Sequence, residues 1–187
     1  MSDPAMKPMT SDEFIAWAMR QPETCRYELF DGEALAMAPE RVAHALTKAH
    51  IWRRLTEAIE AANLPCQAFP DGLAVEVDAH TVFEPDASVH CGERLPPSAL
   101  KLTDPLIVVE VLSPSTSARD VGAKLEGYFR LPSLRHYLIV RVENRTIIHH
   151  GRGEDGVILT RIVREGRIVL DPPGITLADC FPPGATA

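Results

Sequence analysis

The sequence lacks most features that mark secreted, membrane and zinc-ribbon proteins. Its four cysteines, Cys25, Cys66, Cys91 and Cys180, are widely spaced and include no Cys-x-x-Cys pair, which argues against a zinc ribbon and against a disulfide framework. The N-terminus has no basic segment followed by an apolar one, and apolar runs such as 106–109 are too short to span a membrane. We therefore expect a soluble cytoplasmic protein with reduced, partly buried thiols and no membrane partner.

An excess of positive charge is also missing. The formal net charge is −7 at pH 7, whereas a protein that coats DNA through bulk charge would be basic. A nuclease is not excluded, because metal-binding carboxylates count as negative and a local basic patch still engages phosphates. With 187 residues, 45% hydrophobic and 24% charged, the chain fits one domain over 1–187, with loose tails at 1–9 and about 180–187.

Helical and strand patterns alternate along the chain. Thr10 and Glu13 predict a capping box that opens a short helix, and Asp31-Gly32 between two alternating segments predicts a hairpin. Further helices are expected over 42–62 and 118–130. Strands are expected at 65–70, 73–78, 85–91, 105–112, 135–142, 146–150, 157–163 and 167–170. The order predicts an α/β fold, a mixed sheet flanked by helices with a C-terminal β-meander.

Two details of these elements can be checked in a structure. The longest helix is expected to bury residues at three- and four-residue steps, namely Ala45, Ala49, Trp52, Leu55, Ile59 and Ala62. The segment 171–187 contains four prolines and is expected to fray without forming a strand.

Glu110 is the most informative single residue. It lies within 106–112, an apolar run typical of a central strand that is buried on both faces. An unpaired carboxylate at such a position is costly to desolvate, so a metal, a cationic side chain or a shifted pKa must compensate. A buried ion pair, or a glutamate that reaches water at the strand end, is the alternative to a metal ligand.

Asp86 is the second candidate. It follows Pro85, which suits the start of a strand, although an aspartate after proline also often bonds its own backbone in a turn. On a strand beside that of Glu110, the two carboxylates would suit Mg²⁺, which takes one or two protein carboxylates and completes its shell with water and phosphate oxygens. Such a site activates an attacking water.

Lys124 is the third candidate. On the expected helix 118–130 it lies at the border of the apolar stripe, from which its ammonium could reach the sheet. There it could orient a water molecule or neutralise a phosphate. The alternative is an exposed pair with Asp120, four residues earlier, worth only tenths of a kcal/mol.

Together these residues resemble a bacterial family. The segments 27–33, 85–86 and 109–116, with His44 and with Asp120, Lys124 and Tyr128 downstream, are similar to the putative restriction endonucleases abundant in cyanobacteria, within the PD-(D/E)XK nuclease superfamily. The similarity runs from about residue 10 to 142 and more weakly to the end.

The resemblance implies a restriction-endonuclease-like core in which Asp86 and Glu110 hold Mg²⁺ or Mn²⁺. The superfamily places its lysine two residues after the acid, but this chain has Leu112 there, so the resemblance assigns that role to Lys124. It also implies DNA as the substrate and a homodimer.

Supporting roles are assigned by the same resemblance to Glu28, a further carboxylate, and to His44, near the start of the long helix. The alternatives are a cross-strand pair for Glu28 and a packing role for His44. Glu76 is a spare carboxylate of lower rank. A non-catalytic binding or assembly module that kept the fold remains the competing hypothesis, favoured by the missing strand lysine and the acidic charge.

Overall fold

The computed structural model describes residues 7–112 and 118–183, and of 118–120 only the backbone. Three helices lie in this part, α1 (Ser11–Ala18), α2 (Val42–Ala61) and α3 (Ala118–Tyr128). None of the helices in the described residues is long and apolar enough to cross a membrane. The motif residues 113–116 fall outside the described part.

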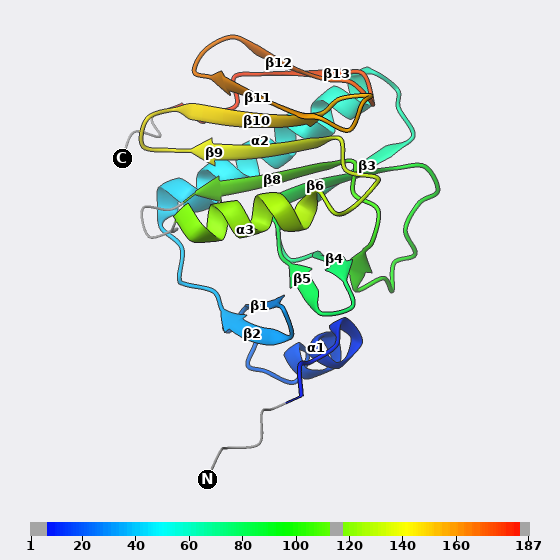
Figure 1. The fold of residues 1–187 in the computed structure, drawn as a ribbon. Helices are drawn as coiled ribbons and strands as arrows, with labels where there is room; N and C mark the ends of the chain where they lie inside the picture. The colour runs from blue at the N-terminus through cyan, green and yellow to red at the C-terminus, as the bar shows by residue number, and fades with distance from the viewer. Residues whose placement is uncertain (1–6, 113–117, 184–187) are drawn as a thin grey trace.

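A six-stranded mixed sheet forms the centre of the molecule, in the order β11-β10-β9-β8-β6-β3. Its strands are β3 (Cys66–Pro70), β6 (Ala87–Cys91), β8 (Ile107–Leu112), β9 (His136–Arg141), β10 (Thr146–Arg152) and β11 (Ile158–Val163). β8 and β9 are parallel, while the other neighbours are antiparallel. In Figure 1, α2 and α3 cover opposite faces of this sheet.

The two faces of β8 pack against different partners because side chains alternate along a strand. Ile107, Val109 and Val111 join the core under α2, whereas Val108 joins the core on the α3 side. All residues of 107–111 are buried, as the apolar run predicts. Glu110 therefore points toward α3.

The buried stripe predicted for α2 is partly wrong. Leu55 and Ile59 are buried as expected, and Trp52 is half-buried. Ala45, Ala49 and Ala62 are exposed, and the buried positions are Thr47, Lys48, Ile51, Leu55 and Ile59. The prediction failed at the alanines because so small a side chain occurs on buried and exposed helix faces alike. The buried stripe therefore lies about one residue away from the predicted one, and it contains a lysine.

A second mixed sheet, in the order β2-β1-β5-β4-β7, lies on the α3 side of the molecule. Its strands are β1 (Tyr27–Phe30), β2 (Glu33–Ala36), β4 (Ala74–Asp78), β5 (Thr81–Phe83) and β7 (Lys101–Leu102). The predicted hairpin and capping box are present; Asp31 and Gly32 have φ of 49° and 85° in the turn. The prediction of an α/β fold is confirmed, although the strands form separate sheets and β5 and β7 were not predicted.

The C-terminal segment does not fray as expected. β12 (Arg167–Leu170) pairs with β13 (Ile175–Ala178) in a two-stranded sheet, and Ile175 and Leu177 join the core under α2. Cys180 and Phe181 are also buried, so the predicted loose tail from about 180 is wrong for its first residues. Apolar alternation within 175–178 outweighs the neighbouring prolines.

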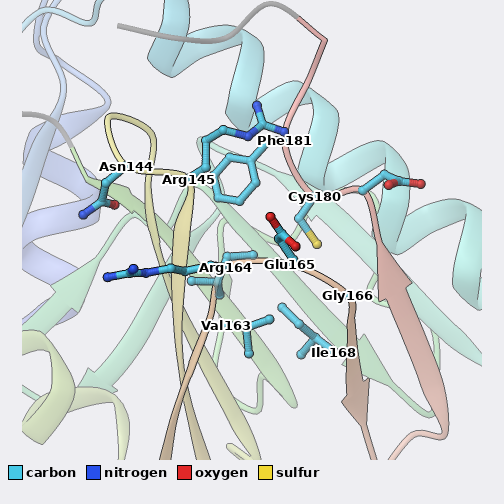
Figure 2. Close-up of a pocket in the computed structure, with 11 residues that line it drawn as sticks. Asn144, Arg145, Val163, Arg164, Glu165, Gly166, Ile168, Cys180 and Phe181 are labelled. Carbon is cyan, nitrogen blue, oxygen red and sulfur yellow. The ribbon is translucent and has the colours of Figure 1, made fainter.

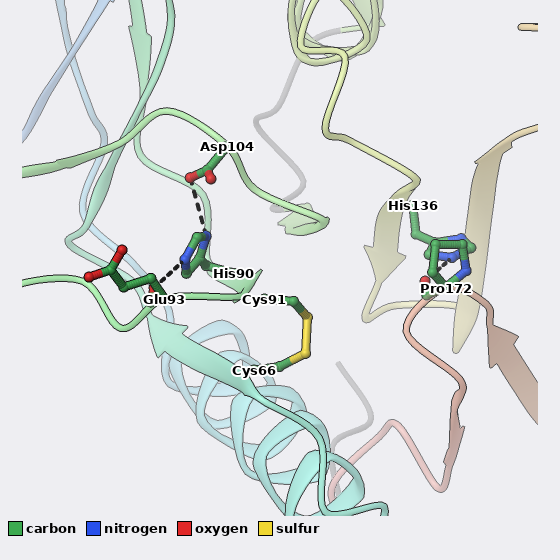
Figure 3. Close-up of a disulfide and its surroundings, with 7 residues drawn as sticks. All are labelled: Cys66, His90, Cys91, Glu93, Asp104, His136 and Pro172. Atoms are coloured by element: carbon green, nitrogen blue, oxygen red, sulfur yellow. Dashed lines mark hydrogen bonds and ion pairs between the residues drawn. A yellow bond between two sulfur atoms is a disulfide. The ribbon is translucent and has the colours of Figure 1, made fainter.

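A disulfide overturns the expectation of four reduced cysteines. Cys66 and Cys91 are direct partners in the antiparallel pairing of β3 with β6 and form a disulfide (Figure 3). Cys25 and Cys180 are free, the first exposed and the second buried. Residues 25 positions apart are brought together by strand register, which cysteine spacing alone does not reveal.

A buried histidine pair makes the fold sensitive to acid. His136 donates from Nε2 to the Pro172 carbonyl at 2.9 Å, and its Nδ1 lies 2.9 Å from Nε2 of His149. Burial lowers the pKa of His149 to about 4, with His136 adding to the effect, and burial also lowers the pKa of His136. The unfolded chain, with histidine pKa values near 6.5, therefore binds more protons between about pH 4 and 6.5.

We expect this pair to cost stability as the pH falls from about 7 to about 4. Urea unfolding at several pH values should show a smaller acid-induced loss in His149→Gln than in the wild type, by roughly 2 kcal/mol. Parallel pH curves for the two proteins would contradict this assignment.

Candidate functional site

Glu110 is positioned by β8 and faces the region between α3 and the second sheet. Its carboxylate accepts from the Tyr128 hydroxyl at 2.7 Å and from Lys124 Nζ at 3.0 and 3.1 Å. Burial raises the pKa of Glu110, Lys124 opposes the rise and the nearby Asp86 and Glu28 carboxylates add to it, so that the pKa lies at about 7. The carboxylate is compensated by a cationic side chain, a hydrogen bond and a shifted pKa together.

Asp86 lies beside Glu110, immediately before β6. Its backbone N–H donates to the Val109 carbonyl at 3.0 Å, and its Oδ2 accepts from the Val111 N–H. The backbone on both sides of Glu110 thus fixes Asp86. The turn alternative, in which an aspartate bonds its own segment, does not describe these contacts.

Lys124 reaches this pair from α3. Its Nζ donates to Glu28 Oε1 at 2.8 Å as well as to Glu110. Burial would lower the pKa of this amine, but the Glu110 and Glu28 carboxylates outweigh burial and raise it. The side chain of Asp120, the alternative partner, lies outside the described part.

The approach of α3 depends on Gly127. A Cβ at this position would lie 2.7 Å from Phe83 Cε2 in β5, closer than real side chains tolerate. Only glycine lets the helix lie this close to the second sheet, which brings Lys124, one turn earlier, within reach of Glu28 and Glu110.

Tyr128 tunes the Glu110 carboxyl through its hydroxyl. Tyr128→Phe removes that donor, so we expect Glu110 to titrate about one pH unit higher, since one net hydrogen bond of about 1 kcal/mol corresponds to that shift. Carbon-detected NMR of the side-chain carboxyl measures the midpoint. An unchanged or lower midpoint would show that the hydroxyl does not stabilise the ionised form.

Lys48 is a site residue that the sequence analysis missed. Its side chain is 6% exposed, and its Nζ contacts Asp86 Oδ1 at 2.9 Å and also pairs with Glu40 and Asp71. Burial would lower its pKa, but Asp86, Asp71 and Glu40 outweigh burial and raise it. The available signal was its position four residues after His44, on the face of α2 that continues through Ile51.

Arg26 extends this network toward the second sheet. It contacts Asp71 at 2.7 Å, Glu84 at 2.9 Å and Glu40 at 3.6 Å. Burial raises the pKa values of Asp71 and Glu84; Lys48 and Arg26 outweigh burial at Asp71 and hold its pKa below the ordinary value, whereas the pKa of Glu84 stays raised. The Glu84 N–H also donates to Glu28 Oε1 at 2.8 Å, which joins the Lys48 and Lys124 groups.

Both supporting residues, Glu28 and His44, lie in the site, whereas the spare carboxylate Glu76 does not. Glu28 lies in the site, and its partners are Lys124 and the Glu84 N–H rather than the cross-strand residue Leu35. His44 Nε2 donates to the Val111 carbonyl and lies 3.9 Å from Asp86 Oδ2. Glu76 lies elsewhere, paired with Lys101 at 2.8 Å.

Several of these side chains line one pocket. Its volume is about 290 Å³, and its walls include Glu28, His44, Asp86, Glu110 and Lys124. The five residues to which the sequence assigned catalytic or supporting roles therefore share one cavity, whereas the spare carboxylate Glu76 does not line it.

A larger pocket of about 480 Å³ lies by the β9–β10 turn (Figure 2). There Arg145 stacks over Phe181, and burial raises the pKa of the Cys180 thiol to about 11. A thiol that stays protonated is a poor nucleophile, so this pocket is not the candidate for catalysis.

The chemistry of the first pocket suits a divalent cation. Six carboxylates form the connected cluster with only three permanently cationic side chains, Arg26, Lys48 and Lys124; the acids are Glu28, Glu40, Asp71, Glu84, Asp86 and Glu110. An excess of carboxylates over cationic side chains provides hard oxygen donors, which favour Mg²⁺-type ions. Oxygens of Glu40, Asp71 and Asp86 lie within 4.8 Å of one another around Lys48. Glu40 and Asp86 also line the pocket with Glu110, whereas Asp71 does not, so the carboxylates in and beside the pocket fit a metal.

Comparison with known proteins points to one family. The model of the Uma2 family, described as "Putative restriction endonuclease", matches residues 11–181. An uncharacterized protein of Synechocystis sp. is 31% identical over 149 residues, covering 79% of this chain and 76% of that protein. The crystal structure of a putative nuclease belonging to DUF820 from Anabaena variabilis has a TM-score of 0.68 and 18% identity, covering 87% of this chain and 88% of the other.

Proposed function

Since the chain belongs to the Uma2 family of putative restriction endonucleases, we propose that it is a metal-dependent endonuclease that hydrolyses DNA phosphodiester bonds on a restriction-endonuclease-like core. The observation that carries the proposal is the shared pocket, in which the carboxylate of Asp86, just before β6, and that of Glu110, in the neighbouring strand β8, meet an amine from α3. Asp86 and Glu110 would hold Mg²⁺ or Mn²⁺ there. The chemistry supplied by such an ion is polarisation of the scissile phosphate and activation of water.

The protein's own groups have separate tasks in this proposal. Lys48 and the Val111 N–H hold both oxygens of Asp86 in place, and the Tyr128 hydroxyl orients Glu110. Lys124 lies beside Glu110 with a charge that its carboxylate partners maintain. It is placed to orient the attacking water or to neutralise the phosphate, the tasks that a lysine on the strand would otherwise perform.

Nicking of supercoiled plasmid with Mn²⁺ tests this function. The wild type should nick, EDTA should stop it, and Lys124→Ala should reduce the rate on the order of 10²-fold because a preorganised charge is lost. Lys101→Ala, which removes an amine paired with Asp12 and Glu76 outside the pocket, serves as the matched control. Equal nicking by all three proteins would indicate a contaminant or a different site.

A binding or assembly module is the second candidate. It is favoured by the absence of a strand lysine at Leu112 and by the amines that already pair with Asp86 and Glu110. A folded wild type that neither binds Mn²⁺ nor nicks DNA would support the module over the enzyme.

A further inference from the structure

One edge of the central sheet is unusually apolar and exposed. β11 ends the six-stranded sheet, and among the described residues it pairs only with β10. Every residue from Val157 to Ile162 is exposed. Four of the ten exposed large hydrophobic side chains in the described part lie here: Val157 (51%), Ile158 (39%), Leu159 (54%) and Ile162 (67%).

The opposite edge of the same sheet is protected. β3 is half-buried and ends at Pro70, the Ala68 carbonyl accepts from the Trp52 indole at 3.1 Å, and Gln67 accepts from the Leu95 N–H. Proline, covering side chains and short length are the usual means of blocking edge pairing. β11 has six residues and contains no proline, so it keeps a free edge that can accept another strand.

We propose that β11 is the dimer interface and that its occupant is β11 of a second copy, paired antiparallel about a twofold axis. A twofold contact requires a self-complementary surface. Pairing centred on Thr160 places Ile158 of one copy opposite Ile162 of the other, on the same face, where cross-strand apolar pairs are stabilising.

Charge at the two ends of the strand favours the same arrangement. Arg164, Glu165 and Arg167 follow the end of β11, a net charge of +1, and Glu154 and Asp155 lie in the turn that precedes it, a net charge of −2. Antiparallel pairing brings the net positive end of each copy close to the acidic turn of the other, although Glu165 then lies opposite Asp155. Parallel pairing would instead bring like charges together, which is destabilising.

The interface is separate from the proposed catalytic pocket, because none of its residues lines that pocket. The dimer can therefore be tested without any assay of nuclease activity, and failure of either proposal leaves the other intact.

Sedimentation velocity of the full chain tests the interface. The wild type should be a dimer, and Ile162→Lys should shift the protein to monomer, since an inward or edge lysine is a natural barrier to strand pairing. Met19→Lys is the control variant. Met19 is 69% exposed and lies at the end of α1, outside β11, so this variant should remain dimeric. Equal melting temperatures of the two variants would show that both fold.

A cysteine crosslink tests the register. With the exposed Cys25 replaced by serine, Thr160→Cys should form a disulfide-linked dimer on mild oxidation, because residue 160 lies next to its own copy. A wild type that stays monomeric at high micromolar concentration would overturn the proposal. This holds even if the β11 edge then proves to bind an extended segment of another protein. A dimer that survives Ile162→Lys and yields no crosslink would overturn it as well.

Discussion

Glu110→Gln is expected to reduce the rate of Mn²⁺-dependent nicking on the order of 10²–10³-fold, and its stability relative to the wild type is expected to rise with pH. Glutamine keeps the shape of the side chain and still accepts from Tyr128, but it offers no charge to a cation. Because burial raises the pKa of Glu110 to about 7, the ionised carboxylate costs folding free energy. Removing it relieves that cost.

The sign of the pH dependence separates this account from general damage. Between about pH 4.5 and 7 the unfolded chain releases the Glu110 proton before the folded chain does, so the wild type loses stability as the pH rises. Relative to the wild type, Glu110→Gln should therefore gain stability from pH 4.5 to 8, by roughly 2 kcal/mol. The quantity to compare is the free energy of unfolding of the variant minus that of the wild type. If this difference falls between pH 4.5 and pH 8, the Glu110 charge stabilises the fold and the account is contradicted.

Lys48→Met is expected to have the largest effect on stability. The ammonium is buried and contacts Glu40, Asp71 and Asp86. Removing one partner from a buried ionic group leaves uncompensated charge, which costs about 3–5 kcal/mol. For a chain of this size we expect the melting temperature to fall by roughly 6–20 °C.

Divalent cations should restore part of this loss. The three carboxylates that lose Lys48 have oxygens within 4.8 Å of one another, so millimolar Mn²⁺ can take the place of the missing charge. Lys101→Met is the control, because it removes an amine paired with Asp12 and Glu76, neither of which belongs to the group of carboxylates around Lys48. If Mn²⁺ raises the melting temperatures of both variants equally, the carboxylates around Lys48 do not form a cation site.

The part of the site that local patterns encode could be predicted from the sequence. Glu110 is evident because a charged residue interrupts an apolar strand, and Asp86 because it follows a proline at a strand start. Lys124 depends on its place at the border of an amphipathic helix. Each of these three sequence patterns is contained in a segment of about a dozen residues around the residue it identifies. The structure brings all three side chains to one pocket.

The other half of the site depends on contacts between distant segments. Asp71 lies in a turn after β3 and Lys48 in the middle of α2, and only the packing of α2 on the sheet brings them together. A lysine in a helix is ordinarily solvated, so its burial could not be inferred without its acidic partners. The Cys66–Cys91 disulfide and β13 were missed for the same reason, since both depend on strand pairing.

The central claim is that the pocket between β6, β8 and α3 binds a divalent cation through Asp86 and Glu110. Isothermal titration of the folded protein with Mn²⁺ measures this directly. The account predicts one site of micromolar to millimolar affinity that disappears in Asp86→Ala, with the variant still folded. No binding by the wild type, or equal binding by both proteins, would contradict it.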